Sequence, residues 1–93
     1  MNMTPQYIKI NKDRDKRYFS DKEMTIYHRE DGPAIETVSG HKFWILNGKF
    51  HRKGGPAVEY VDGTNEWWLD DIKYTKKQFK KEIANLLEKQ DKI

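Results

Sequence analysis

The chain has 93 residues, no cysteine, equal 35% shares of hydrophobic and charged residues, and a formal net charge of +3. This length suits one domain, and the missing cysteines exclude disulfides and thiolate metal sites. No apolar run reaches the ~18 residues of a membrane span, and the first five residues lack a signal peptide's apolar segment. We therefore expect a cytoplasmic protein whose aromatic residues, 13% of the chain, supply much of the core.

Residues 1–27 are expected to form an N-terminal cap rich in strands. Tyr7-Ile8-Lys9-Ile10 alternates with the period of a strand. Residues 17–19 and 24–27 could pair through a turn at 20–23. Residues 24–27 come directly before His28, just as Lys49-Phe50 comes directly before His51. This suggests that the N-terminal segment is the degraded remainder of an earlier repeat.

Residues 28–50 and 51–74 are two copies of one unit, with a constant spacing of 23 residues. Such periodicity indicates a supersecondary unit stacked on its own copy. Each copy is expected to form a meander of three short strands. The predicted strands are 34–38, 42–46 and 49–51 in the first copy, and 57–61, 65–69 and 72–74 in the second. Asn47-Gly48 is a strong signal for a two-residue hairpin turn.

The charges predict the register of the first hairpin in each copy. A three-residue loop that contains a glycine pairs Glu59 with Asn65, whereas a two-residue turn sets Glu59 opposite Glu66. Like charges in opposed positions are unfavourable, so we expect the three-residue loop with a glycine bulge. The same register pairs Glu36 with Lys42.

This register separates a repeated face from a variable face. The repeated face carries Ala34, Glu36, Trp44 and Leu46, and their counterparts Ala57, Glu59, Trp67 and Leu69. The variable face carries Ile35, Thr37, Phe43 and Ile45, and their counterparts Val58, Tyr60, Glu66 and Trp68. Trp and Tyr are favoured at interface hot spots, so we predict a protein-binding patch on the variable face, formed by Trp68, Tyr60, Phe43 and Ile45. The alternative is that the C-terminal helix covers this patch.

Residues 75–93 are expected to form one amphipathic helix. Thr75 and Gln78 have the spacing of a capping box, and apolar side chains follow at helical spacing from Phe79 to Leu87. This stripe could pack on the variable face or pair with the helix of a second copy, giving a homodimer.

The His-Arg pairs at 28–29 and 51–52 favour a structural role, in which each arginine binds loop carbonyls or nearby acids. Phosphate binding is the alternative, and a basic nucleic-acid site would use Arg29, Arg52, Lys76 and Lys77. No metal-ligand spacing, nucleophile elbow or cofactor motif is present, so no catalytic residue, metal or cofactor is expected.

The pattern His-Arg-x-x-Gly-Pro-Ala followed by Trp-x-Leu-Asn-Gly resembles a tandem-repeat family common in tailed bacteriophages, itself similar to MORN-type β-hairpin repeats. The resemblance covers about residues 17–79, with Gly54 in place of an acid and Asp71 in place of a turn glycine. It implies a mainly β (α+β) fold of hairpin repeats with one C-terminal helix. It also implies a non-enzymatic accessory protein that binds a host protein, such as a defence nuclease or toxin, in the host cytoplasm. The small basic nucleic-acid-binding protein is kept as the alternative.

Overall fold

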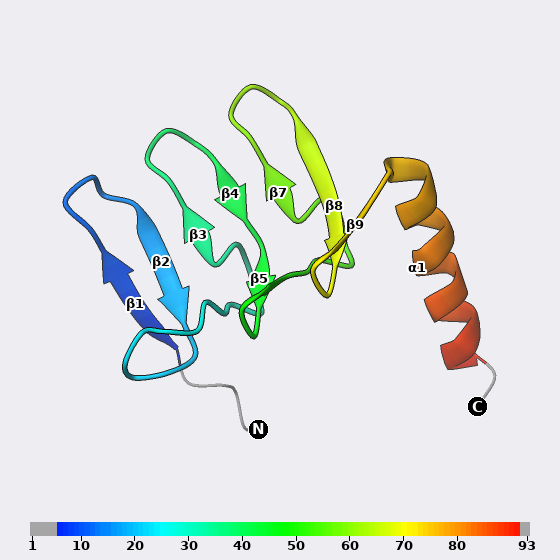
Figure 1. Ribbon diagram of the computed structural model, residues 1–93, viewed down its shortest axis with the longest axis horizontal. Coiled ribbons are helices and arrows are strands. Elements are labelled where there is room, and N and C mark those ends of the chain that lie inside the picture. Colours follow the sequence, from blue (N-terminus) through cyan, green and yellow to red (C-terminus); the bar gives the residue numbers. More distant parts are fainter. Residues whose placement is uncertain (1–5, 92–93) are drawn as a thin grey trace.

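The computed structural model describes residues 6–91 and confirms a mainly antiparallel β fold with one C-terminal helix. The elements are β1 (Tyr7–Ile10), β2 (Lys16–Phe19), β3 (Ile35–Glu36), β4 (Lys42–Phe43), β5 (Ile45–Leu46), β6 (Lys49–Phe50), β7 (Val58–Glu59), β8 (Asn65–Leu69), β9 (Ile72–Tyr74) and α1 (Lys76–Asp91). Three hairpins stand side by side in chain order, and the helix follows them (Figure 1).

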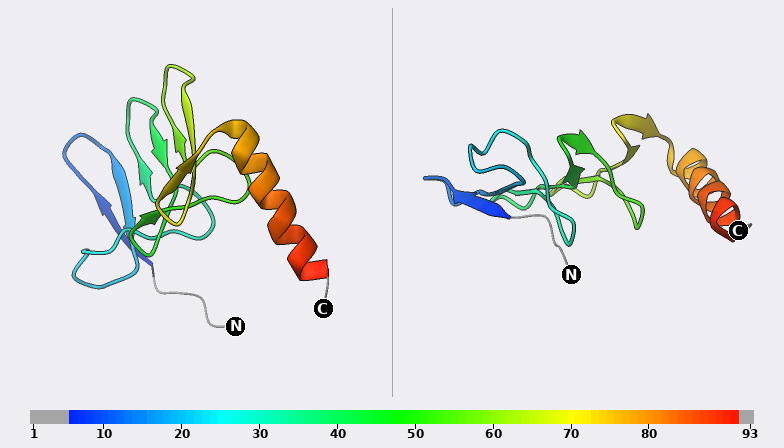
Figure 2. Two further views of the ribbon diagram at one scale, coloured as in Figure 1. Left: turned by 45° about the vertical axis from the view of Figure 1, so that its right-hand side comes forward. Right: turned by 90° about the horizontal axis from the view of Figure 1, so that it is seen from below.

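The strands form one sheet with the order β1-β2-β3-β4-β7-β8-β9, and β5 and β6 form a separate hairpin. The second strand of one hairpin therefore pairs with the first strand of the next, β2 with β3 and β4 with β7, whereas β8 of the second copy pairs with β9. The hairpins lie in one thin layer, and the shortest extent of the molecule is 18 Å (Figure 2). Within residues 6–91, no second sheet lies across either face (Figure 2).

The predicted register is confirmed. Glu59 pairs with Asn65, and Glu36 pairs with Lys42. The loop glycines Gly40 and Gly63 have φ angles of 108° and 91°, so each loop uses a backbone conformation that residues with a Cβ rarely adopt. These glycines allow the three-residue loops. The loops in turn set Glu36 across from a residue of opposite charge, Lys42, and Glu59 across from a neutral one, Asn65.

Several strands are shorter than predicted, and the expected strand 42–46 is interrupted at Trp44. The Trp44 amide donates to the carbonyl of Ala57, whereas its carbonyl accepts from the amide of His51. The chain thus leaves the large sheet and enters the β5-β6 hairpin at this residue. A hydrophobic pattern of period two cannot reveal this change of partner, because the side chains keep alternating through it.

The N-terminal segment forms a hairpin of β1 with β2, a pairing that the sequence did not predict. Its strands β1 and β2 pair in register, and Tyr18 donates to the carbonyl of Ala34 as Trp44 donates to Ala57. The predicted pairing of residues 17–19 with 24–27 is reduced to a bridge between Phe19 and Tyr27, flanked by two backbone hydrogen bonds, from Ser20 to Ile26 and from His28 to Tyr18. Asp21 holds the intervening loop by accepting the amides of residues 25 and 26.

Helix α1 begins with the predicted capping box. The Thr75 amide donates to Gln78 Oε1 at 3.0 Å, and the Gln78 amide donates to Thr75 Oγ1 at 3.1 Å. The helix packs against β8 and β9 and stands at the end of the sheet, in line with it (Figure 2). Phe79 is buried there, whereas Leu87 is 56% exposed. The apolar stripe therefore covers the end of the last hairpin, rather than lying across the variable face.

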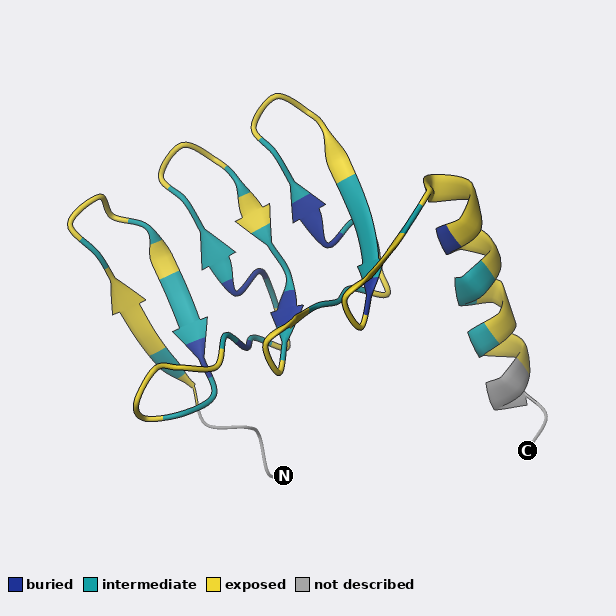
Figure 3. Cartoon of the chain, viewed as in Figure 1, coloured by how far each residue is buried: buried dark blue, intermediate teal, exposed yellow. Residues whose placement is uncertain are grey.

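Buried residues gather where neighbouring repeats meet, and the hairpin tips are exposed (Figure 3). Ala34 and Ala57 are fully buried at equivalent positions of the two copies, and Val58 is almost fully buried. In the part of the chain that the structure describes, no helix has the length and apolar character needed to cross a membrane.

Candidate protein-binding face

The repeated arginine fixes each repeat onto an aromatic ring of the repeat before it. The Arg52 guanidinium carbon lies 3.7 Å from the centroid of the Trp44 ring. Its Nη1 donates to the Pro56 carbonyl at 3.0 Å and reaches Glu59 Oε2 at 3.2 Å. Stacking, a backbone hydrogen bond and an ion pair therefore engage Arg52 within the protein.

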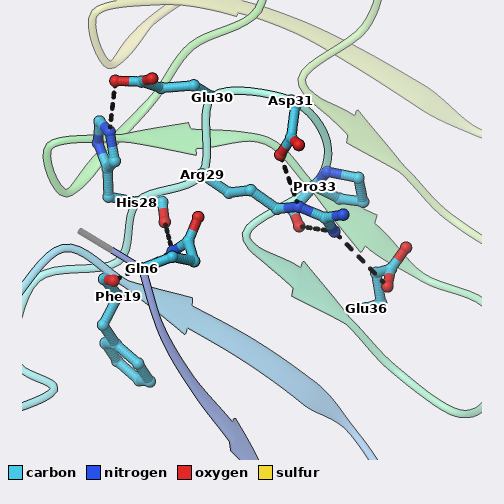
Figure 4. A network of polar contacts seen from close by, with 8 residues as sticks. All are labelled: Gln6, Phe19, His28, Arg29, Glu30, Asp31, Pro33 and Glu36. Atoms are coloured by element: carbon cyan, nitrogen blue, oxygen red, sulfur yellow. Dashed lines mark hydrogen bonds and ion pairs between the residues drawn. The ribbon is translucent and has the colours of Figure 1, made fainter. Parts of the chain in front are cut away.

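Arg29 repeats this arrangement one unit earlier. It lies 4.0 Å over the Tyr18 ring, donates to the Pro33 carbonyl, and contacts Asp31 and Glu36 (Figure 4). The nearby side-chain amide of Gln6 donates to the carbonyls of Phe19 and His28, which ties the N-terminal hairpin to the first copy (Figure 4). The structural interpretation of the repeated arginines is thus supported in both copies.

The histidines join the start of each copy to the hairpin turn near the end of the same copy. His28 Nδ1 accepts the amide of Asn47 at 2.9 Å, and His51 Nδ1 accepts the amide of Asp70 at 3.0 Å. The next turn amide, from Gly48 or Asp71, donates to the carbonyl that precedes each histidine. Both turns need positive φ at two residues, and Asp71 adopts it at 66° although it stands where the first copy has glycine. Asp71 also accepts the Phe50 amide at 2.8 Å, a bond that a glycine cannot make.

The residues predicted for a nucleic-acid site are not brought together into one cationic surface. Arg29 and Arg52 border one shallow hollow on the repeated face, but each is paired with an acid. Lys76 lies 5.9 Å over the Trp67 ring at the start of α1, and Lys77 is exposed on that helix. The four cations are therefore divided between paired arginines on the sheet and exposed lysines on the helix, whereas a phosphate backbone is bound by cations that lie together.

Three of the four residues predicted for protein binding belong to one aromatic cluster, which also contains Phe50. Ring centroids are 6.2 Å apart for Phe43 and Tyr60, 6.4 Å for Phe43 and Phe50, and 5.2 Å for Phe50 and Trp68. The four rings are partly exposed. The aromatic cluster (Phe43, Phe50, Tyr60 and Trp68) thus joins side chains from both copies on the variable face.

An apolar groove of about 280 Å³ adjoins the cluster. It is lined by Tyr27, Ile35, Phe43, Ile45, Gly48 and Phe50. Ile45, the fourth predicted residue, is only 5% exposed. It therefore belongs to the floor of the groove, because the β5-β6 register sets Phe50 opposite it.

Polar contacts orient the end of the cluster that lies nearest the helix. Trp68 Nε1 donates to Glu66 Oε1 at 2.9 Å, and the Tyr60 hydroxyl lies 3.4 Å from Glu66 Oε2. Lys73 pairs with the same carboxylate at 3.6 Å. Loss of water around the phenol raises the pKa of Tyr60, and the negative charge of Glu66 raises it further. One carboxylate thus fixes the polar ends of two rings and leaves their apolar surfaces facing outward.

Phe50 and Tyr27 were missed as site residues. They occupy equivalent positions, each directly before the repeated histidine. That equivalence was a usable signal, because a residue that precedes a turn-binding histidine must point away from the turn, toward the variable face.

Comparison of the chain with protein-family models, with curated proteins and with solved structures yields no match. Among residues 6–91, no group of three or more potential ligands could hold a metal ion. The variable face, with its aromatic cluster and apolar groove, is therefore the candidate site.

Proposed function

We propose that the chain is a non-catalytic binding module that engages a partner protein through its aromatic cluster. The observation that carries this proposal is the linked set of four partly exposed rings beside an apolar groove. Aromatic side chains offer large contact areas and few rotatable bonds, which makes them frequent hot spots. The helix leaves this face to a partner, since it packs at the end of the sheet.

The resemblance to bacteriophage repeat proteins extends the proposal to the kind of partner. A small phage accessory protein of this type would bind a host protein in the host cytoplasm and block it by occupying its surface. A defence nuclease or a toxin is the kind of target that such occupation would inhibit. Nucleic-acid binding receives less support, because Arg29 and Arg52 already stack on rings and pair with acids.

The test is capture of host proteins by the unaltered protein and by the double variant Trp68→Ala/Tyr60→Ala. We expect a specific protein to be retained by the unaltered chain and its affinity for the double variant to fall more than about tenfold, which is about 1.4 kcal/mol. A matched control is Val38→Ala/Val61→Ala, which removes exposed apolar side chains at the hairpin tips. This control should retain the partner fully.

Circular dichroism and thermal unfolding of each variant separate a lost contact from a lost fold. Equal binding by the double variant and the control would contradict the assignment of the face. Retention of nucleic acid instead, with an affinity that falls steeply as salt rises, would favour the alternative function.

A further inference from the structure

Arg17 extends the variable face on the side of the N-terminal hairpin. Arg17 lies opposite Ile35, and Ile35 lies opposite Phe43. Directly opposed residues of antiparallel strands point to the same side of a sheet, so the guanidinium shares a face with the apolar groove. Tyr27 connects the two features, because it lines the groove and its hydroxyl accepts a hydrogen bond from Arg17 Nη1 at 3.0 Å.

Arg17 has hydrogen-bonding capacity that the protein does not use. Among the described residues, Arg17 Nη2 has no hydrogen-bond acceptor and forms only a long ion pair with Asp15 at 3.9 Å, whereas Nε is buried without a hydrogen-bond partner and is closed to solvent. Arg29 and Arg52 differ, since each stacks on a ring and donates to a carbonyl. The Arg17 side chain is also 35% exposed, so a carboxylate can approach it from solvent.

The charges on this face are separated along the sheet. Six residues lie in one cross-strand row, in the order Lys9, Arg17, Ile35, Phe43, Val58 and Glu66. The row begins with two cations, continues through three apolar side chains and ends with an acid. The hollow next to Tyr27 is lined by Lys9, Arg17 and one acid, Glu23. A partner segment that crosses the strands therefore meets positive charge at one end of the groove.

We propose that the partner presents an apolar segment that carries an acidic side chain, with the apolar groups in the groove and the carboxylate on Arg17. The two contacts would lie roughly 5–10 Å apart, since neighbouring strands are about 4.8 Å apart and one to two strand spacings separate Arg17 from the groove. This inference rests on the proposed function, because it specifies the partner of the same face. A charge-assisted hydrogen bond from a guanidinium to a carboxylate is roughly twice as strong as a hydrogen bond between neutral groups.

The test is selection of a displayed random dodecapeptide library on the unaltered protein and on Arg17→Gln. The unaltered protein should select apolar peptides enriched in Asp or Glu. Arg17→Gln should still select apolar peptides but lose the acidic enrichment, whereas Arg17→Lys should keep it. The matched control is Arg14→Gln, which removes a charge from the exposed loop between β1 and β2 and should behave like the unaltered protein.

A second measurement uses the unaltered protein alone, so it does not depend on a variant that folds. A selected peptide should bind about tenfold more tightly than the same peptide with its acid changed to the amide, a difference of about 1.4 kcal/mol. Equal affinities, or selected peptides without acidic enrichment, would overturn this inference while leaving the proposed function standing. Failure to select any peptide that depends on Phe43 and Phe50 would overturn both.

Discussion

The Arg52 guanidinium carbon lies over the ring of Trp44, 3.7 Å from its centroid, and so links the second copy of the repeat to the first. The same guanidinium also donates a hydrogen bond to the Pro56 carbonyl. One side chain therefore stabilises both the bend of the chain at Pro56 and the stacking of the second copy on the first. Its equivalent, Arg29 over Tyr18, links the first copy to the N-terminal hairpin.

Replacing Arg52 by alanine is expected to lower the free energy of unfolding by about 1–3 kcal/mol, since it removes a cation–π contact and a hydrogen bond from a charged donor. Urea denaturation followed by tryptophan fluorescence and circular dichroism measures the change. The neighbouring exposed Lys53→Ala is the control and should be nearly neutral. Equal stability of the two variants would mean that the stacking contributes nothing.

Gly32→Ala should destabilise the protein by about 1 kcal/mol, because the guanidinium must leave its preferred rotamer to admit a methyl group. A Cβ at position 32 would lie 2.8 Å from Arg29 Cζ, whereas a Cβ at Gly54 would meet nothing within 4 Å. Gly54→Ala is therefore the matched control and should be neutral. When Arg29 is already replaced by alanine, Gly32→Ala should lower the free energy of unfolding by a smaller amount. If the effects of the two substitutions simply add in this double-mutant cycle, the proposed clash is contradicted.

His28→Ala should cost more stability than His51→Ala. Both histidines accept the amide of an exposed turn residue, but His28 is 5% exposed whereas His51 is only partly buried, so loss of the His28 ring leaves the larger cavity. Loss of the hydrogen bond costs about 0.5–1.5 kcal/mol in either variant, and the cavity at position 28 adds to it. Thermal unfolding ranks the two variants, and amide hydrogen exchange should show faster exchange at Asn47 in His28→Ala. Unchanged exchange at that amide would contradict the assigned bond.

The phenol of Tyr60 should titrate above its ordinary pKa of 10.0, because the charged form loses hydration and faces Glu66. Because the pKa of Tyr60 is higher in the folded state than in the unfolded state, the neutral phenol contributes to the free energy of unfolding. This contribution is complete below the ordinary pKa and is lost as the pH rises through the raised pKa. The measurement is a phenolate absorbance titration, with Tyr60→Phe used to assign the transition. Glu66→Gln should shift the Tyr60 transition to lower pH; an unchanged transition would show that the carboxylate does not influence it.

The sequence predicted the features that depend on local signals or on opposed side chains. The register of Glu59 with Asn65 followed from like-charge repulsion, and the helix start followed from Thr75 and Gln78. The division into two faces also followed from the register. These features depend on residues close in the chain, so their spacing carries the information.

The parts that could not be predicted depend on where a hydrogen-bond partner lies in three dimensions. Trp44 bonds to Ala57 with its amide and to His51 with its carbonyl, and neither choice alters the apolar pattern. The position of α1 at the end of the sheet, rather than across the variable face, was equally hidden, because Phe79 can be buried in either arrangement. Arg17 was overlooked because its importance comes from Ile35 and Tyr27, which are distant along the chain.

Arg29 and Arg52 make equivalent contacts, so the number of repeats in the chain could change by one whole unit. Removing residues 28–50 would join Tyr27 directly to His51 and place Arg52 over Tyr18, where Arg29 lies now. The turn-binding histidine would still meet Asp70, so every junction would be rebuilt from existing residues. Unequal recombination between the two copies can therefore shorten or lengthen such a gene by one whole unit while preserving the fold, and a wider or narrower binding face would follow from one genetic event.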